Sequence, residues 1–187
     1  MLFRSAVVTD ALGAPVLDAL GNQIPIDFWL WGNAGNDIVT GDAGNDHLSG
    51  GLGNDTIDGG AGTDTARFAA SVAGLTDGAL VNVEAVEITN TGAGSYDLSG
   101  QSEALTVIGG AGADTITGGA GADRLLGNGG NDILIATAGD SLIDGGSGTD
   151  TARFAASVAG LSDAGLANVE AVEITSTGSG KIGRAHV

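Results

Sequence analysis

Aspartates recur in this sequence at steps of nine residues, each after a glycine-rich stretch. The first run is Asp37, Asp46, Asp55 and Asp64; the second is Asp114, Asp123, Asp132 and Asp150, with Ser141 at the one step that lacks an aspartate. Carboxylates repeated at short intervals repel one another unless a cation lies between them. Calcium fits best, because it takes about six to eight oxygen ligands in flexible geometry, whereas magnesium requires a stricter octahedron. We therefore expect the aspartates to bind calcium.

Each aspartate is the sixth residue of a unit of the form G-G-x-G-x-D-x-U-x, in which U is apolar. The first block, residues 32–67, holds four units; the second, residues 109–153, holds five, of which 136–144 is degenerate. Glycine reaches positive φ without steric cost, so the first part of each unit predicts a tight turn. The last three residues predict a short strand with U pointing inward, because strand side chains alternate.

One inward residue per unit predicts a narrow core in each block. The expected core residues are Val39, Leu48, Ile57 and Ala66 in the first block and Ile116, Leu125, Leu134, Ile143 and Ala152 in the second. Burial of one such side chain contributes about 1.5–3 kcal/mol, while ordering the backbone costs about 1–2 kcal/mol for each residue of the unit. The free energy gained by apolar burial is therefore too small to offset the cost of ordering the backbone, and we expect calcium to drive folding.

These units resemble the RTX family, also called haemolysin-type calcium-binding repeats, over 81 of the 187 residues. The resemblance implies an all-β fold, a right-handed parallel β-roll or β-helix solenoid, in which metal-free β-helical spacer coils join two calcium-binding blocks. Two units form one coil, so alternate turns stack about 4.8 Å apart. For a single aspartate, a solvated turn residue is the simpler interpretation; the regular array favours the metal.

In the RTX family each ion lies between stacked turns, held by an aspartate and by carbonyl oxygens of the glycine region from both turns. By position, the resemblance implies four well-formed sites, Asp37 with Asp55, Asp46 with Asp64, Asp114 with Asp132, and Asp132 with Asp150. A fifth site, Asp123 with Ser141, lacks a carboxylate and is expected to be weak or empty unless Asp140 compensates. The carbonyl oxygens would come from the region of Gly32, Gly41, Gly50, Gly51, Gly59, Gly109, Gly110, Gly118, Gly119, Gly127 and Gly145.

The charge balance favours cations as partners. The chain has 23 acidic residues against 6 basic ones, a formal net charge of −17, which argues against nucleic-acid binding. It has no cysteine, so a bound metal takes the place of disulfides. No stretch approaches the roughly 18 apolar residues of a membrane span, and no signal peptide is evident at the start. The resemblance implies type I secretion and an extracellular or cell-surface location.

A longer repeat overlies the short one, because residues 59–89 recur as residues 145–175. We expect residues 1–31 to be the end of a preceding domain with a linker and an aromatic cap, 32–67 the first block, 68–108 a spacer, 109–153 the second block, and 154–180 a truncated second spacer. Residues 181–187 are basic, and one reverse translation of them contains the start of a common sequencing adapter, so we expect a non-native tail rather than a basic strand end.

The spacer is expected to continue the solenoid, because Leu98 and Val107 precede Ile116 at steps of nine. Its Glu84 and Glu87 are expected to be exposed strand residues rather than additional ligands. Two interpretations remain open for each of two other sets of side chains. Arg67 and Arg153 either close each aspartate ladder with a positive charge or lie exposed, and the cluster Phe28, Trp29, Leu30 and Trp31 either caps the roll or forms a sugar-binding platform.

No catalytic arrangement is evident. The sequence lacks H-E-x-x-H and contains only His47 and His186, so neither a zinc protease site nor a histidine-based triad can form. We expect a calcium-binding structural module of a secreted or surface protein, such as an adhesin or S-layer protein. The alternative is the C-terminal repeat region of a secreted hydrolase, a protease or lipase; an H-E-x-x-H or G-x-S-x-G motif upstream would favour it. An ice-binding solenoid is disfavoured, because outward Thr-x-Thr ladders are not sustained.

Overall fold

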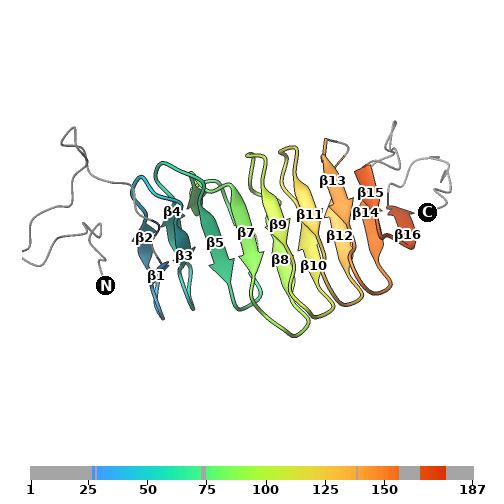
Figure 1. The fold of residues 1–187 in the computed structure, drawn as a ribbon, viewed down its shortest axis with the longest axis horizontal. Coiled ribbons are helices and arrows are strands. Elements are labelled where there is room, and N and C mark those ends of the chain that lie inside the picture. Colours follow the sequence, from blue (N-terminus) through green and yellow to red (C-terminus); the bar gives the residue numbers. More distant parts are fainter. Residues whose placement is uncertain (1–26, 28, 73–74, 138, 156–164, 176–187) are drawn as a thin grey trace, which may run out of the picture. The chain divides into compact units, whose positions relative to one another are not determined.

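The computed structural model describes residues 27, 29–72, 75–137, 139–155 and 165–175. The expectations for residues 1–26, for Phe28, for 156–164 and for the tail 181–187 lie outside the described residues. None of the described residues belongs to a helix long and apolar enough to cross a membrane. The fold is all-β with parallel strand pairing, as expected (Figure 1). Two compact units are distinguished, Met1–Arg67 with Gly78–Val83, and Phe68–Asp77 with Glu84–Val187.

The first unit contains the first repeat block. Its strands are β1 (Trp29–Trp31), β2 (Ile38–Thr40), β3 (His47–Ser49), β4 (Thr56–Asp58), β5 (Thr65–Phe68) and β6 (Leu80–Val81). Odd-numbered strands pair in the order β1-β3-β5 and even-numbered strands in the order β2-β4-β6. Every second strand therefore pairs in parallel, which confirms that two nine-residue units form one coil.

The second unit contains spacer strands and the second repeat block. Its strands are β7 (Ala85–Ile88), β8 (Ser95–Asp97), β9 (Thr106–Ile108), β10 (Thr115–Thr117), β11 (Arg124–Leu126), β12 (Ile133–Ala136), β13 (Leu142–Asp144), β14 (Thr151–Phe154), β15 (Leu166–Ala167) and β16 (Ala171–Ile174). They form two sheets, β7-β9-β11-β13-β15 and β8-β10-β12-β14-β16. Spacer strands on both sides of the block thus continue its two sheets as one β-solenoid.

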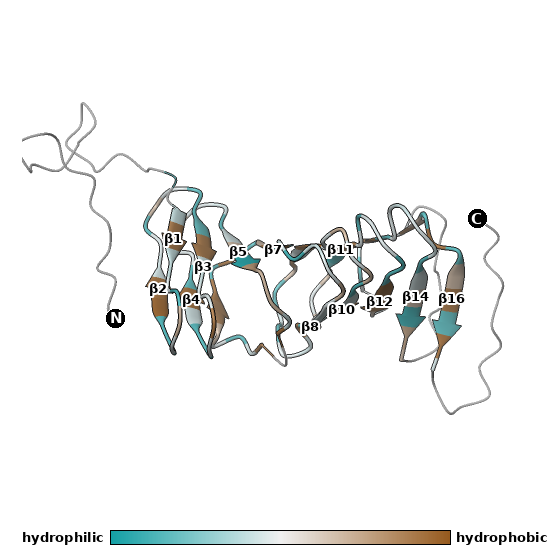
Figure 2. Ribbon diagram, turned by 90° about the horizontal axis from the view of Figure 1, so that it is seen from below, coloured by the Kyte–Doolittle hydropathy of each residue, from teal (hydrophilic) through white to brown (hydrophobic). Residues whose placement is uncertain are grey.

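The core follows the nine-residue period. All nine expected core residues are buried, each with at most 2% of its surface exposed. They lie at the middle of three-residue strands or at the second position of longer ones, and parallel pairing stacks them in register, as in Leu48 on Ala66 and Ile116 on Leu134. Hydrophobic and hydrophilic residues follow each other closely along the short strands (Figure 2). The alternation of strand side chains therefore placed the core correctly.

The spacer continues the core with a different register from the one expected. Val107 pairs with Leu125, as the nine-residue step predicts. Ile116, however, pairs with Tyr96, not with Leu98. The coil from Tyr96 to Ile116 spans 20 residues, against 18 from Ile116 to Leu134, so the step of nine does not hold there. Leu98 is still buried, but it lies just after β8, where its backbone N–H donates to the Thr117 carbonyl.

Candidate metal centre

Glycines in the turns allow one coil to lie directly on the next. Gly148 has a φ of +144°, and a Cβ added there would collide with the carbonyl oxygen of Gly130 in the preceding coil. Gly53, with a φ of +141°, stands in the same relation to the Gly35 carbonyl. Glycine is required at these positions both for its backbone angles and for the missing side chain. The turns therefore stack with their carbonyl oxygens facing neighbouring coils.

The turn aspartates are buried, which is costly for carboxylates unless a cation compensates. Asp55 is half-buried. The other seven expose at most 5% of their surface and are Asp37, Asp46, Asp64, Asp114, Asp123, Asp132 and Asp150. The sequence pattern predicted these residues as ligands, and the fold removes nearly all of them from solvent.

Hydrogen bonds connect the aspartates of consecutive coils. In each connection the backbone N–H of one aspartate donates to Oδ1 of the aspartate 18 residues later. The four donor–acceptor distances are 2.9 Å from Asp37 to Asp55, 2.7 Å from Asp46 to Asp64, 2.8 Å from Asp114 to Asp132 and 2.7 Å from Asp132 to Asp150. These are the four pairs implied by the family resemblance, so the structure brings both members of each pair together.

The second carboxylate oxygen is informative in two aspartates of the second block. Oδ2 of Asp132 and Oδ2 of Asp150 are buried without a hydrogen-bond partner among the described residues. In contrast, Oδ2 of Asp114 and of Asp123 accept hydrogen bonds from backbone N–H groups of their own turns, at 3.0 and 2.8 Å. Buried oxygens without partners require an explanation, and a cation ligated by them provides one.

Carbonyl oxygens lie beside these two Oδ2 atoms. A Cβ added at Gly127 would meet both Oδ2 of Asp132 and the carbonyl oxygen of Gly145 in the next coil. Only glycine leaves that space open. Carboxylate and carbonyl oxygens together are the ligands that calcium prefers, so the residues present fit this ion.

The other expected carbonyl-bearing glycines also lie between coils. Gly32, Gly41 and Gly59 resemble Gly127, because an added Cβ would meet the aspartate of the same turn and a carbonyl of the next coil. At Gly109 the added Cβ would meet the Gly127 and Leu126 carbonyls, and no aspartate is among the three nearest atoms. Gly51, Gly110 and Gly119 face carbonyls of the preceding coil, and at Gly50 and Gly118 the nearest atoms include Asp55 and Asp123 respectively. The described residues contain no cluster of three or more acidic, histidine or cysteine side chains able to hold a metal, so backbone oxygens would have to complete any site.

Burial raises the pKa of Asp132 to about 6. The backbone N–H of Asp114 opposes this effect by donating to the carboxylate, and the negative charges of Asp150 and Asp114 add to it. Among the described residues, no basic side chain forms an ion pair with any of the four sixth-position aspartates of the second block, Asp114, Asp123, Asp132 and Asp150. A divalent cation would supply the missing positive charge.

At the expected fifth site, in the degenerate unit 136–144, Asp140 rather than Ser141 contacts the Asp123 backbone N–H. The Asp123 backbone N–H donates to Oδ1 of Asp140 at 3.2 Å, and the Thr137 backbone N–H donates to Oδ2 at 2.7 Å. The Ser141 hydroxyl donates to the Asp123 carbonyl at 3.1 Å. Burial raises the pKa of Asp140. Asp140 thus has two hydrogen-bonded carboxylate oxygens, in contrast to Asp132 and Asp150.

A glutamate that follows the second block joins the ladder. The Asp150 backbone N–H donates to Oε2 of Glu170 at 2.7 Å, where the next aspartate would otherwise lie. Glu170 is the copy of Glu84 in the long repeat. Of the two glutamates expected to be exposed strand residues, Glu84 is exposed but lies just before β7, and Glu87 lies within β7 and is half-buried. The nine-residue motif could not identify Glu170, because the turn before it contains no glycine-aspartate signature. Coil spacing could not identify it either, because Glu170 follows Asp150 by 20 residues rather than 18.

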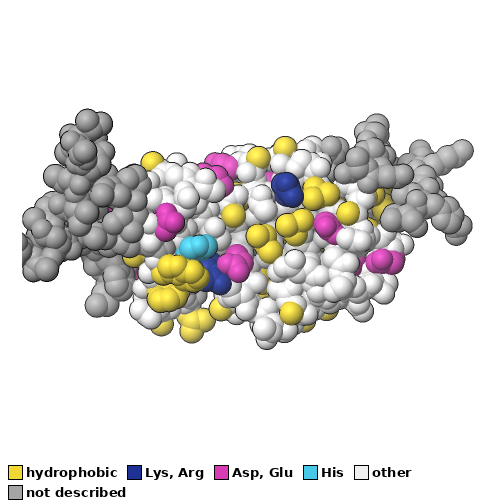
Figure 3. Space-filling model, in the orientation of Figure 1, with side chains coloured by type: hydrophobic (Ala, Val, Ile, Leu, Met, Phe, Trp, Pro, Cys, Tyr) yellow, Lys and Arg dark blue, Asp and Glu magenta, His cyan; other side chains and the backbone are white. Residues whose placement is uncertain are grey.

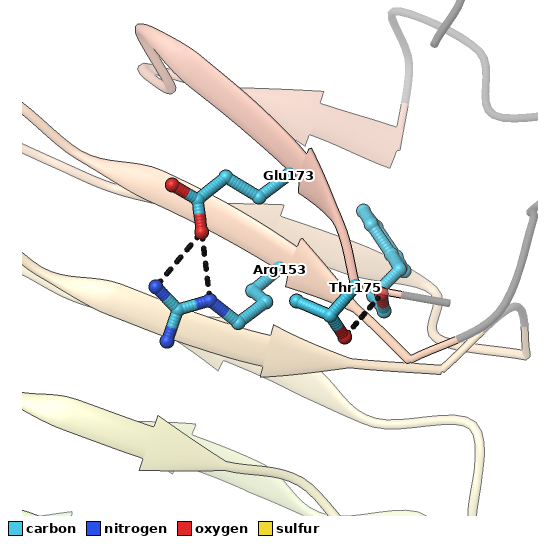
Figure 4. A network of polar contacts seen from close by, with 4 residues as sticks. Arg153, Glu173 and Thr175 are labelled. Carbon is cyan, nitrogen blue, oxygen red and sulfur yellow. Dashed lines mark hydrogen bonds and ion pairs between the residues drawn. The ribbon is translucent and has the colours of Figure 1, made fainter. Parts of the chain in front are cut away.

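Arg153 does not close the aspartate ladder. Its guanidinium forms an ion pair with Glu173 on the neighbouring strand β16, with an N–O distance of 2.8 Å (Figure 4). Directly after β16, the Thr175 hydroxyl donates to the Phe154 carbonyl at 3.2 Å. Both contacts hold the segment that contains β16 against β14.

The tryptophans do not cap the end of the core as expected. Leu30 continues the inner stack by pairing with Leu48, but Trp29 and Trp31 point outward and are 53% and 56% exposed. The reason is strand alternation, which places neighbours of an inward residue outside. Trp29 stacks on His47 with 4.5 Å between ring centroids, and the Arg67 guanidinium lies 4.7 Å from the Trp29 ring centroid. Figure 3 shows this face, where hydrophobic side chains adjoin the histidine and an arginine.

Comparison with protein-family models gives a match to a model described as the RTX calcium-binding nonapeptide repeat (4 copies). It covers residues 31–66, 106–134 and 126–153. These segments include nearly all of the first block and the whole second block. Comparisons with curated proteins and with solved structures give no significant match.

Proposed function

Because the chain carries RTX calcium-binding nonapeptide repeats in both blocks, we propose that calcium bound between the stacked turns completes the folding of a structural or adhesive module. The parent would be a secreted or cell-surface protein. One observation carries this proposal above the others: Asp132 and Asp150 each bury a carboxylate oxygen that has no hydrogen-bond partner among the described residues.

The proposed ligands are the eight turn aspartates together with carbonyl oxygens of the glycine regions. Within the second block, Oδ2 of Asp132 and the Gly145 carbonyl face the same space. Both are hard oxygen ligands, which select calcium over softer metals. The four aspartate pairs connected by hydrogen bonds would hold four ions, and each ion would supply the positive charge that a pair of buried carboxylates lacks.

Binding and folding are coupled in this arrangement. The carboxylates approach one another only when coils stack, so the unfolded chain has no preformed site and the free energy of binding adds to the free energy of folding. Most strands contain only three or four residues, and each contributes little to the core. Removal of calcium should therefore disrupt the stacking of the turns before it affects any other interaction.

The extracellular location is proposed from calcium supply and composition. Calcium-binding modules outside cells operate at about 10⁻⁴–10⁻³ M calcium, and a chain without cysteine has no disulfide to take over the stabilising role. The duplication of residues 59–89 as 145–175 supports a repeated structural module rather than a catalytic one. We assign no catalytic role to the described residues.

The test is a calcium titration of the chelator-treated full chain, followed by far-ultraviolet circular dichroism. We expect a largely disordered chain to gain β structure at about 10⁻⁴–10⁻³ M calcium, with bound calcium measured in parallel by equilibrium dialysis. Magnesium at the same concentrations should give a much smaller change. An equal β signal in chelator and in calcium would refute coupled folding, and absence of bound calcium would refute the proposed function.

A further inference from the structure

We propose that another calcium ion binds where the second block meets the last spacer strands. This junction site is formed by Asp150, Gly145, Asn168 and Glu170. It rests on the proposed function, because it uses the same ion and the same kinds of oxygen ligand. It differs in lying outside the nine-residue motif, since Asn168 and Glu170 belong to the spacer.

The first observation is the state of the Asp150 carboxylate. Asp150 is fully buried, and its Oδ1 accepts a hydrogen bond from the Asp132 backbone N–H at 2.7 Å. Its Oδ2 is buried and has no hydrogen-bond partner among the described residues. That oxygen lies 2.6 Å from the position a Cβ would take on Gly145, and the Asn168 carbonyl oxygen contacts the same position. Oxygens from two coils therefore lie close together beside Gly145.

The junction repeats the contacts of the neighbouring arrangement, with Asn168 in place of a glycine and Glu170 in place of an aspartate. There, the space beside Gly127 is bordered by Oδ2 of Asp132 and the Gly145 carbonyl, while the Asp132 N–H donates to the Asp150 carboxylate. One coil later, the space beside Gly145 is bordered by Oδ2 of Asp150 and the Asn168 carbonyl, while the Asp150 N–H donates to the Glu170 carboxylate at 2.7 Å. Each ligand of the first arrangement thus has a counterpart in the second.

The local sequence explains how a spacer segment can take the place of a glycine turn. Asn168 has a φ of +49°, in the left-handed region that asparagine tolerates, and its side-chain amide donates to Oδ1 of Asp144 at 2.7 Å. Val169 is buried and anchors the segment. The turn from Asn168 to Glu170 is much shorter than the six-residue turn of a repeat unit. Glutamate, with one methylene more than aspartate, spans the remaining distance to Asp150.

Two glutamates on this segment have different interaction partners. Glu173 is already compensated by the ion pair with Arg153 (Figure 4). Glu170 instead binds a backbone N–H next to the buried Asp150 carboxylate, so two acidic groups meet without an ion pair to a described basic residue. A divalent cation at the junction would neutralise both.

The test counts bound ions in the full chain. Native mass spectrometry at saturating calcium should find one ion fewer in Glu170→Gln than in the unaltered chain. Glutamine keeps a carbonyl oxygen that can accept the Asp150 N–H, so a purely structural hydrogen bond would leave the ion count unchanged. Glu173→Gln is the matched control, three residues along the same segment, and should keep every ion.

The outcomes separate this inference from the proposed function. A chain that binds no calcium at all would refute both. A chain that binds calcium while Glu170→Gln keeps the full ion number would overturn the junction site alone. Circular dichroism at saturating calcium accompanies the count: unchanged β signal with one ion lost supports the site, whereas loss of the β signal together with all ions of the second block argues for a structural role of Glu170 instead.

Discussion

The two oxygens of a turn aspartate perform different tasks. In Asp132 and Asp150, Oδ1 accepts the backbone N–H of the preceding coil and so fixes the stacking, while Oδ2 has no hydrogen-bond partner among the described residues. Substitution by asparagine keeps an oxygen for the first task and removes the charge needed for the second. Asparagine variants therefore test metal binding with little disturbance of the ladder.

Asp132 should be more sensitive to this change than Asp123. Asp132 belongs to two of the expected pairs, with Asp114 and with Asp150, whereas the Asp123 carboxylate accepts backbone hydrogen bonds at both oxygens. We expect Asp132→Asn to raise the calcium midpoint of folding by about tenfold or more, corresponding to about 1.4 kcal/mol or more. Asp123→Asn loses one of its two accepted hydrogen bonds but belongs to none of the four aspartate pairs, so it should change the midpoint several times less. Circular dichroism titrations of both variants provide the comparison, and equal losses would contradict the pairing of aspartates 18 residues apart.

Acidification should weaken calcium binding near pH 6. The pKa of Asp132 is raised to about 6 in the metal-free fold, against about 3.9 for an unfolded chain. Protonation stabilises the metal-free fold as the pH falls, because it removes the free-energy cost of burying a charged carboxylate. That cost is fully present above about pH 6. Calcium requires the carboxylate, so the calcium midpoint should rise as pH falls below about 6.

The same titration of Asp132→Asn provides the control. Between about pH 5 and 7 its calcium midpoint should depend less on pH than that of the unaltered chain, because the titrating carboxyl has been removed. The same pH dependence in both chains would mean that other groups compete with calcium in this range.

At the scale of elements, the turn glycines decide how closely coils approach. Gly148→Ala should destabilise the calcium-bound fold by about 1–3 kcal/mol, because alanine is strained at positive φ; its Cβ would also collide with the Gly130 carbonyl. Gly139→Ala is the control, since a Cβ there would meet nothing closer than 3.7 Å and the φ of Gly139 is not in the left-handed region. Chemical denaturation at saturating calcium measures both, and a comparable loss from Gly139→Ala would contradict the steric argument.

Sequence spacing predicted the regular elements because one local rule repeats in them. Strand alternation identified the inward residues of both blocks, and glycine spacing identified the turns. The rule failed where the chain departs from the period. Tyr96 replaced Leu98 opposite Ile116 because that coil is two residues longer than the next, and Asp140 replaced Ser141 because its neighbouring carboxylate reaches the Asp123 N–H. Such substitutions depend on three-dimensional proximity, which spacing alone does not encode.

On the scale of the whole molecule, charge and metal supply determine when the chain folds. The formal net charge of −17 opposes compaction through self-repulsion, and the two blocks place much of that charge inside. Calcium neutralises the buried carboxylates, while dissolved salt screens the exposed charges. Monovalent salt alone should therefore fail to replace calcium, whatever its effect on the surface.

The position of the tryptophans allows folding of the first block to be followed separately. The chain has two tryptophans, both on β1, whose pairing with β3 belongs to the first unit. Trp29 contacts His47 only when that pairing forms, so its emission should change as calcium fills the first block. Asp46→Asn should shift this emission change to higher calcium by about three- to tenfold, whereas Asp132→Asn should leave it nearly unchanged.

The prediction follows from the local character of solenoid contacts, in which each coil touches its immediate neighbours and stability is a sum of nearest-neighbour terms. Far-ultraviolet circular dichroism reports both blocks, so Asp132→Asn should alter that signal while tryptophan emission stays close to that of the unaltered chain. An equal shift of tryptophan emission by both variants would show that the two blocks fold as one cooperative unit. In that case the ion at one aspartate ladder would stabilise the other through the strands between them, and block-by-block stability would not be definable.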